Sequence, residues 1–154
     1  MRKIALVLFT STLLLPSFAQ DKSADRKSAF NYANNVAIKG YDPIAYFIQN
    51  SAVKGKKDIA ISNMGIIYYF ATEANKNLFK LNPSKYEPQY GGWCAYAMGS
   101  DGTKVEIDPA TFKIVDSKLY LFYNKYFTNT LKSWNKNENK FKTSADANWL
   151  KIYN

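Results

Sequence analysis

Two sulfur-bearing residues in the segment YGGWCAYAMG, Tyr90 to Gly99, have types and spacing that could do chemistry. Cys94 is the only cysteine among 154 residues, and Met98 follows it four positions later. If the segment is helical, both side chains lie on one face, and thiolate and thioether sulfurs suit Cu(I). With Met64 from an upstream turn, they form a candidate soft-metal set. The alternative, which we favour over Cu(I), is that both are buried core residues, because methionines at such spacing usually fill cores.

Cys94 is also a candidate catalytic nucleophile. A reactive thiolate needs a base, a cationic neighbour or a helix N-terminus that lowers its pKa. The chain has no histidine, which excludes Ser-His-Asp and Cys-His catalysis and histidine-based zinc sites. A helix beginning at Gly91 or Gly92 could still activate the thiol. We therefore expect a protein that is not an enzyme, with a thiol-dependent enzyme using Cys94 as one alternative.

A second group of residues could bind a small molecule, because tyrosine and tryptophan combine apolar area with a polar tip. The candidate ligand-binding residues are Asp42, Tyr46, Tyr90, Trp93, Cys94 and Tyr96. The simpler interpretation, which we favour for most of the aromatic residues, is that they fill the core of a small domain. Asp42 precedes Pro43, and this pair is typical of a helix start, with the carboxylate as cap.

The N-terminus has the pattern of a signal peptide. Arg2 and Lys3 precede an apolar run from Ile4 to Leu15, and small residues stand at the −3 and −1 positions of a cut after Ala19. The run is too short to span a bilayer as a helix, although an uncleaved anchor is the alternative. We expect a signal peptide over residues 1–19 and an exported protein, periplasmic or secreted.

The net charge and the single cysteine limit the classes of binding partner and the states of Cys94 that we expect. The formal charge is +9, which becomes about +7 once Arg2 and Lys3 leave with the signal peptide. We interpret this as a solvated lysine-rich surface, with weak contact to an anionic membrane surface as the alternative. The sequence has no recognised nucleic-acid motif, so we expect no nucleic-acid partner. A single thiol forms no internal disulfide, and an exported protein exposes few free thiols, so we expect Cys94 to be buried.

The pattern of apolar residues and turns predicts an α+β fold, a small antiparallel sheet of hairpins with several short packed helices. We expect a flexible leader or short helix over residues 20–30 and one domain over 31–154. The hairpins are expected at 56–72 and 112–123, with turns at 63–65 and 116–117. Helices are expected at 43 onward, 73–82 after a Thr72 cap, 93–98 with Gly99 as stop signal, 126–135 and 144–152.

Four segments, taken in order, resemble the signature segments of exported bacterial YHS-domain proteins. These are VAIKGYDPIAYF, NPSKYEPQYGGWCAYAMG, FKIVDSKLYLFYN and ADANWL. The resemblance runs from Val36 to Leu150. It classifies the chain more than it explains it, because most such proteins have no assigned activity.

The wider YHS group includes metal-associated modules whose pattern contains several cysteines. In this chain Asp42-Pro43-Ile44 is similar to the start of that pattern, but alanines stand at the cysteine positions: Ala45, Ala71 and Ala74. A soft-metal site needs several converging thiolate or imidazole ligands. The metal-binding role that the resemblance implies therefore does not carry over to these positions.

Our main hypothesis from the sequence is a non-catalytic module that binds a small ligand or a metal. The alternative from another class is a structural or interaction protein that contacts an envelope partner through its basic surface. The sequence identifies neither the ligand nor the oligomeric state.

Overall fold

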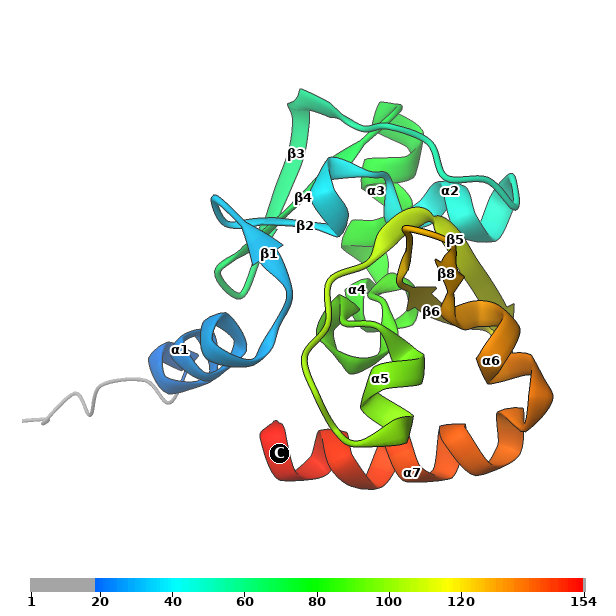
Figure 1. Cartoon of the computed structure of the whole chain (residues 1–154). Helices are drawn as coiled ribbons and strands as arrows, with labels where there is room; N and C mark the ends of the chain where they lie inside the picture. Colours follow the sequence, from blue (N-terminus) through cyan, green and yellow to red (C-terminus); the bar gives the residue numbers. More distant parts are fainter. Residues whose placement is uncertain (1–18, 154) are drawn as a thin grey trace, which may run out of the picture.

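The computed structural model describes residues 19–153 (Figure 1). Residues 1–18 of the predicted signal peptide lie outside the described residues. The helices are α1 Ala19–Ala29, α2 Pro43–Ile48, α3 Glu73–Leu81, α4 Pro83–Tyr86, α5 Ala95–Ser100, α6 Thr130–Lys136 and α7 Glu138–Ile152, with 3-10 turns η1 Ile38–Gly40 and η2 Gln89–Gly92. The strands are β1 Tyr32–Ala33, β2 Val36–Ala37, β3 Lys56–Asn63, β4 Ile66–Phe70, β5 Asp108–Val115, β6 Lys118–Phe122, β7 Asn124–Lys125 and β8 Thr128–Asn129.

The described strands form one four-stranded sheet, of order β1-β2-β4-β3, and the hairpins β5-β6 and β7-β8. The pairing of β2 with β4 is parallel, and the remaining pairs are antiparallel. In Figure 1 the helices α2 and α3 lie beside the four-stranded sheet, while α7 crosses the opposite end of the molecule beneath α5. The predicted α+β class is confirmed.

Both long hairpins turn where the sequence predicted. The β3-β4 turn has Met64 at φ 48° and Gly65 at φ 86°, and the β5-β6 turn has Asp116 at φ 50° and Ser117 at φ 58°. Two consecutive residues with positive φ give the tight turn whose twist matches that of paired strands. The turn positions follow from local sequence alone.

The two predicted helix caps are also confirmed. The Asp42 carboxylate accepts a hydrogen bond from the Ile44 amide at 2.8 Å. The Thr72 hydroxyl accepts one from the Asn75 amide at 3.1 Å. Each side chain satisfies a backbone donor that has no partner inside its helix.

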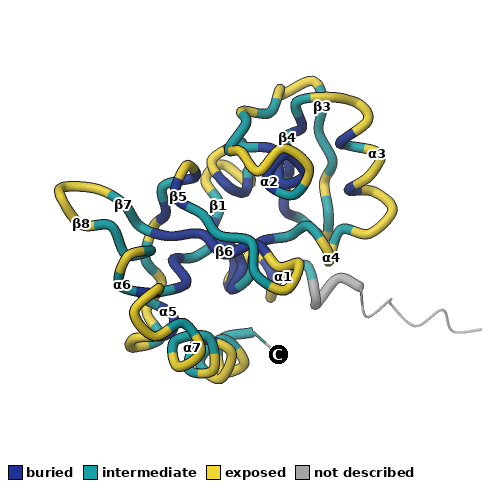
Figure 2. Tube along the Cα trace, turned by 90° about the vertical axis from the view of Figure 1, so that its right-hand side faces the viewer, coloured by how far each residue is buried: buried dark blue, intermediate teal, exposed yellow. Residues whose placement is uncertain are grey.

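The buried residues form two clusters. The larger one is centred on β4 and β6 and includes Tyr68, Phe70 and Cys94. The smaller one lies against α5, α6 and α7 and includes Met98 and Trp134. Figure 2 shows buried β4, α2 and β6 inside the molecule and the exposed outer surface of α7.

Of the two alternatives for the segment before residue 31, a flexible leader and a short helix, the structure shows the helix. Residues 19–29 form helix α1, and its C-terminal end is part of the folded domain. Arg26 and Ala29 are buried, and Phe30 packs on Trp149 with a ring distance of 5.8 Å. A flexible leader cannot form such contacts, so the ordered domain begins before residue 31.

The helix predicted over 126–135 is wrong in its first four residues. Tyr126 and Phe127 occupy the turn that follows β7, with φ values of 48° and 68°, and the next two residues form β8. The helical spacing of Phe127, Leu131 and Trp134 produced the error, because a periodic pattern does not show where a helix begins. Helix α6 starts at Thr130, and Asn129 caps it.

Two details of the C-terminal half also differ from prediction. Gly99 lies inside α5 rather than after it, and a Cβ there would lie 2.4 Å from the carbonyl oxygen of Phe141. Glycine is therefore needed for the close approach of α5 to α7. Helix α7 begins at Glu138, earlier than the predicted Ser144. Among residues 19–153 no helix has the length and apolar character required to cross a bilayer.

Candidate functional site

The structure does not bring the predicted soft-metal residues together. Cys94 immediately precedes α5 and has a non-helical backbone (φ −58°, ψ 115°), so the one-face rule for positions four apart within a helix does not apply. Cys94 lies in the larger buried cluster and Met98 in the smaller one. Met64 is 42% exposed at the β3-β4 turn. Within residues 19–153 there is also no group of three or more His, Cys, Asp or Glu residues arranged to hold a metal ion.

Cys94 is fully buried, as predicted. Its sulfur accepts a hydrogen bond from the Tyr123 amide at 3.4 Å and lies 3.3 Å from the Thr130 hydroxyl. That hydroxyl donates its one hydrogen to the Tyr123 carbonyl at 2.9 Å, so the thiol donates to Thr130. The thiol thus has both donor and acceptor roles filled by the chain, an arrangement that favours a structural role over nucleophilic attack.

Asp42 and Tyr46, two further predicted ligand residues, are fully buried and bonded within the fold. Besides capping α2, the Asp42 carboxylate accepts from the Ala71 amide at 2.8 Å and from the Asn75 side-chain amide at 2.6 Å. The Tyr46 phenol donates to the Pro109 carbonyl at 2.9 Å, and burial raises its pKa well above the usual value. Both side chains join separate segments of the core.

Trp93 and Tyr96 are half-buried and also pack within the domain. The Trp93 indole N–H donates to the Ala29 carbonyl at 2.7 Å, which ties the end of α1 to this segment. The Tyr96 ring packs on Phe141 at 4.8 Å between centroids. Neither residue lines the cavity beside Trp149 described below, and of the six predicted ligand residues only Tyr90 does so.

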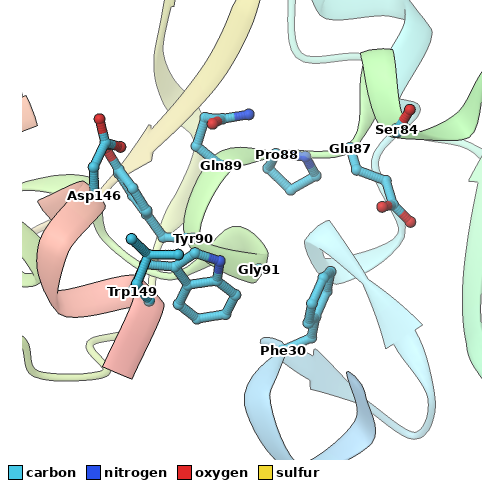
Figure 3. A pocket seen from close by; sticks show the side chains of 10 residues that line it. Phe30, Ser84, Glu87, Pro88, Gln89, Tyr90, Gly91, Asp146 and Trp149 are labelled. Atoms are coloured by element: carbon cyan, nitrogen blue, oxygen red, sulfur yellow. The ribbon is translucent and has the colours of Figure 1, made fainter. Parts of the chain in front are cut away.

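A cavity of about 340 Å³ lies between the end of α1, the 84–91 segment and α7. Phe30, Tyr90 and Trp149 provide aromatic walls, and Glu87 and Asp146 provide carboxylates. In Figure 3 Asp146 lies beside Tyr90 at one end of the group and Glu87 lies near Ser84 at the other, with Trp149 and Phe30 below. The remaining lining residues are Ser84, Pro88, Gln89, Gly91 and Leu150.

Tyr90 connects the YGG turn to α7. Its phenol donates to the Asp146 carboxylate at 2.9 Å. Burial raises the pKa of the Tyr90 phenol well above its usual value, and the negative charge of Asp146 adds to that shift. The phenol therefore stays neutral and keeps donating, which holds Asp146 at the cavity edge.

The backbone of the YGG turn is shaped to accept Trp149. Tyr90 has φ 55° and Gly91 has φ 60°, values that side chains beyond glycine rarely adopt. A Cβ on Gly91 would lie 2.8 Å from the Trp149 ring. Glycine is needed at position 91 because the indole occupies the space of a side chain there.

Glu87 is the centre of a buried polar network. One carboxylate oxygen accepts from the Arg26 guanidinium at 2.6 Å, from the Asn63 amide at 2.8 Å and from the Tyr68 phenol at 3.0 Å. Burial acts to lower the pKa of Arg26, but the Glu87 charge raises it, and the pKa ends above its usual value. Burial and the Glu87 charge raise the pKa of Tyr68.

The lining of this cavity contains two carboxylates and no lysine or arginine, although the chain carries a formal charge of +9. Arg26 compensates Glu87 from behind the wall. Asp146 is exposed and bonded to a neutral phenol. The cavity therefore presents negative charge and aromatic surface on an otherwise basic protein.

Sequence reasoning missed Phe30, Glu87, Asp146 and Trp149 as cavity residues. Three of them stand in the quoted segments NPSKYEPQYGG and ADANWL. That position was a usable signal, since segments that carry a resemblance often enclose a site. Phe30 had no such signal, because it was assigned to the leader.

A second hollow, of about 420 Å³, lies beside β2 and the start of β3 and is lined by Lys39, Lys54 and Lys57. The Lys39 ammonium already donates to the Ile107 carbonyl at 2.7 Å and pairs with Glu106 at 3.2 Å. The Lys54 ammonium donates to the Lys39 carbonyl at 2.6 Å. Two of the three lysines that line this hollow therefore already have partners within the protein.

Comparisons of the chain with known protein families, with curated proteins and with solved structures found no match. The resemblance to YHS-domain proteins therefore stays a prediction.

Proposed function

We propose that this chain is an exported YHS-type binding protein that holds a small aromatic amine, or a comparable ligand with an apolar body and a positive end, in the cavity beside Trp149. The observation that carries the proposal is the exposed Asp146 carboxylate in an aromatic lining that contains no lysine or arginine, in a strongly basic chain. Aromatic side chains attract cations through their ring faces, and a few polar groups in an apolar pocket fix ligand orientation.

Asp146 is the group that would receive the positive end. One of its oxygens accepts from Tyr90, and a carboxylate can accept further bonds on its other lone pairs. Glu87 already carries three donors on one oxygen, so its charge is largely used inside the fold. Trp149 and Phe30 would contact the apolar body of the ligand.

Three matched probes test the proposal: benzylamine, benzyl alcohol and benzoate, which share a ring and differ in charge. We expect benzylamine to raise the melting temperature in proportion to ligand occupancy and to change tryptophan fluorescence. Benzyl alcohol should act weakly and benzoate not at all. Equal binding of benzoate, or no effect of any probe, would contradict the proposal.

A variant locates the charge contact. Asp146→Asn keeps an oxygen that can accept from Tyr90 but removes the negative charge, so it should fold and bind benzylamine several-fold more weakly. Asp101→Asn is the matched control, because Asp101 is exposed and does not line the cavity. Equal loss in both variants would show a long-range charge effect rather than a contact.

The soft-metal alternative has less support, because its three sulfur residues lie in different surroundings. Cu(I) titration of the purified protein and of a Cys94→Ser variant tests it directly. Binding of one equivalent of Cu(I) that is lost in the variant would favour the metal over the amine.

A further inference from the structure

Two adjacent aromatic side chains stand at the tip of the β7-β8 hairpin with almost no contact to the protein. Tyr126 is 86% exposed and Phe127 is 112% exposed relative to a free reference residue. Figure 2 shows this hairpin projecting from the body of the molecule with its tip exposed. Neither cavity described above is lined by a residue of the hairpin.

The tip is also unfavourable for the backbone. Tyr126 and Phe127 have φ values of 48° and 68°, in the left-handed region that costs energy for residues other than glycine. Two-residue turns of this kind favour asparagine and glycine. The aromatic residues therefore neither ease the turn nor add to the core, so the fold alone does not account for them.

The chain segment that contains the tip is strongly basic. Residues 113–142 contain two acidic residues, Asp116 and Glu138, and seven lysines, a net charge of +5 by subtraction. Asp116 is paired with Lys142 and Glu138 with Lys113. The other five lysines are Lys118, Lys125, Lys132, Lys136 and Lys140, all exposed.

Two structural features keep part of this charge near the tip. Lys125 belongs to β7 and immediately precedes Tyr126. Helix α6 starts directly after β8, and its lysines at 132 and 136 are four residues apart and share one face. The hairpin is tied to this helix by the Thr130 amide, which donates to the Tyr123 carbonyl at 3.0 Å.

We propose that the β7-β8 hairpin is a membrane anchor that inserts Tyr126 and Phe127 into the interface of an anionic bilayer while neighbouring lysines contact lipid head groups. Aromatic side chains favour this interface because one end is apolar and the other is polar. Lysines near an anionic surface add attraction that salt screens.

The shape of the tip favours a lipid surface over a folded protein partner. The hairpin is convex and presents two side chains, whereas a stable protein interface needs about 1,000 Å² of complementary surface. A bilayer accepts a convex tip without a matching groove. The positive charge around it fits a surface that is uniformly negative.

The decisive variant is Tyr126→Asn/Phe127→Gly, which places the preferred residues in the turn and so should fold at least as well as the natural chain. Flotation with vesicles of phosphatidylcholine containing phosphatidylglycerol measures binding, with pure phosphatidylcholine as the neutral comparison. We expect the natural protein to float with the anionic vesicles. The affinity of the variant for these vesicles should be lower by a factor of about ten or more. Burying one aromatic side chain in an apolar environment contributes about that factor.

Two controls separate the contributions. Leu81→Asn removes a residue that is 83% exposed elsewhere and should not change vesicle binding. Lys125→Gln should weaken binding to anionic vesicles and reduce its salt dependence. Phe127→Trp with brominated lipid should show fluorescence quenching beyond that of the three natural tryptophans.

Several results would overturn the proposal. They are no flotation of the natural protein, equal flotation of the Asn-Gly turn variant, and equal binding to neutral and anionic vesicles. Sedimentation showing that the natural protein dimerises while the turn variant does not, without vesicle binding, would assign the tip to a second copy instead. This anchor does not depend on the amine-binding cavity, and benzylamine binding by the turn variant would show that the two are separate.

Discussion

The Arg26 guanidinium lies 2.6 Å from the Glu87 carboxylate, and the two residues are 61 positions apart. Their side chains are 6% and 11% exposed. This pair fastens α1, which precedes the predicted domain, to the turn that carries Tyr90. The N-terminal helix is therefore part of the folded domain, and Phe30, which directly follows it, lines the cavity.

We expect Arg26→Ala to lower the free energy of unfolding by about 3–5 kcal/mol, because removing one partner leaves the other charge buried and uncompensated. Urea unfolding followed by circular dichroism measures this. Lys76→Ala is the matched control, since Lys76 pairs with Glu73 at the surface, and such pairs contribute about 0–1 kcal/mol. A similar loss of unfolding free energy in both variants would show that the buried ion pair stabilises the fold no more than a surface ion pair does.

Gly99→Ala should destabilise the protein by about 1–3 kcal/mol, since overpacking forces backbone shifts. The new Cβ would lie 2.4 Å from the Phe141 carbonyl oxygen, and backbone cannot move aside without displacing α7. Ser100→Ala, at the next and exposed position of α5, is the control and should be nearly neutral. A neutral Gly99→Ala variant would mean that α5 and α7 are not packed this closely.

The Cys94 thiol should be unreactive toward Ellman's reagent in the folded protein and should titrate as one thiol in denaturant, because it is buried and bonded on both sides. Cys94→Ser, which keeps a donor and an acceptor, should be less destabilising than Cys94→Val, which keeps neither. Rapid labelling of the native thiol would instead revive the thiol-enzyme alternative.

Stability should fall as the pH rises above about 10, the usual pKa of tyrosine. The pKa values of Tyr46, Tyr68 and Tyr90 are raised in the folded state, and burial is the largest cause. The folded state therefore retains protons that the unfolded chain loses. Below pH 10 these phenols are protonated in both the folded and the unfolded state, so the pH has no effect on stability through them. Above pH 10 the free energy of unfolding falls by about 1.4 kcal/mol per pH unit for each such tyrosine.

Melting temperatures from pH 8 to pH 12, with phenolate absorbance at 295 nm, test this expectation. The three phenolates should appear only with unfolding. Tyr46→Phe removes one of the three and should flatten the alkaline fall. An unchanged slope in that variant would show that Tyr46 ionises normally.

Local features were predictable because they depend on neighbours in sequence. The Asp42 and Thr72 caps, the Met64-Gly65 and Asp116-Ser117 turns, and the α+β class follow from residue types within a few positions. The burial of Cys94 was predicted from the presence of a single cysteine and from the predicted export.

The residues that form the cavity, in contrast, are brought together by contacts between segments far apart in the sequence. Nothing in the residues around Tyr90 specifies Asp146, which lies 56 positions away, and nothing around Arg26 specifies Glu87. The conformation of Tyr126 and Phe127 was likewise not predictable from neighbouring residues. The spacing of Phe127, Leu131 and Trp134 fits one face of a helix, but the chain turns sharply at Tyr126 and Phe127 and leaves both side chains exposed.

The sequence by itself determined the turns, the caps, the class of fold and the absence of histidine chemistry, because short-range hydrogen bonds and residue types decide these. Only the tertiary structure decided which aromatic residues line a cavity, which carboxylates face it and which residues stand alone at a tip. Those properties depend on how α1, the YGG turn and α7 pack together, and packing is set by the whole chain.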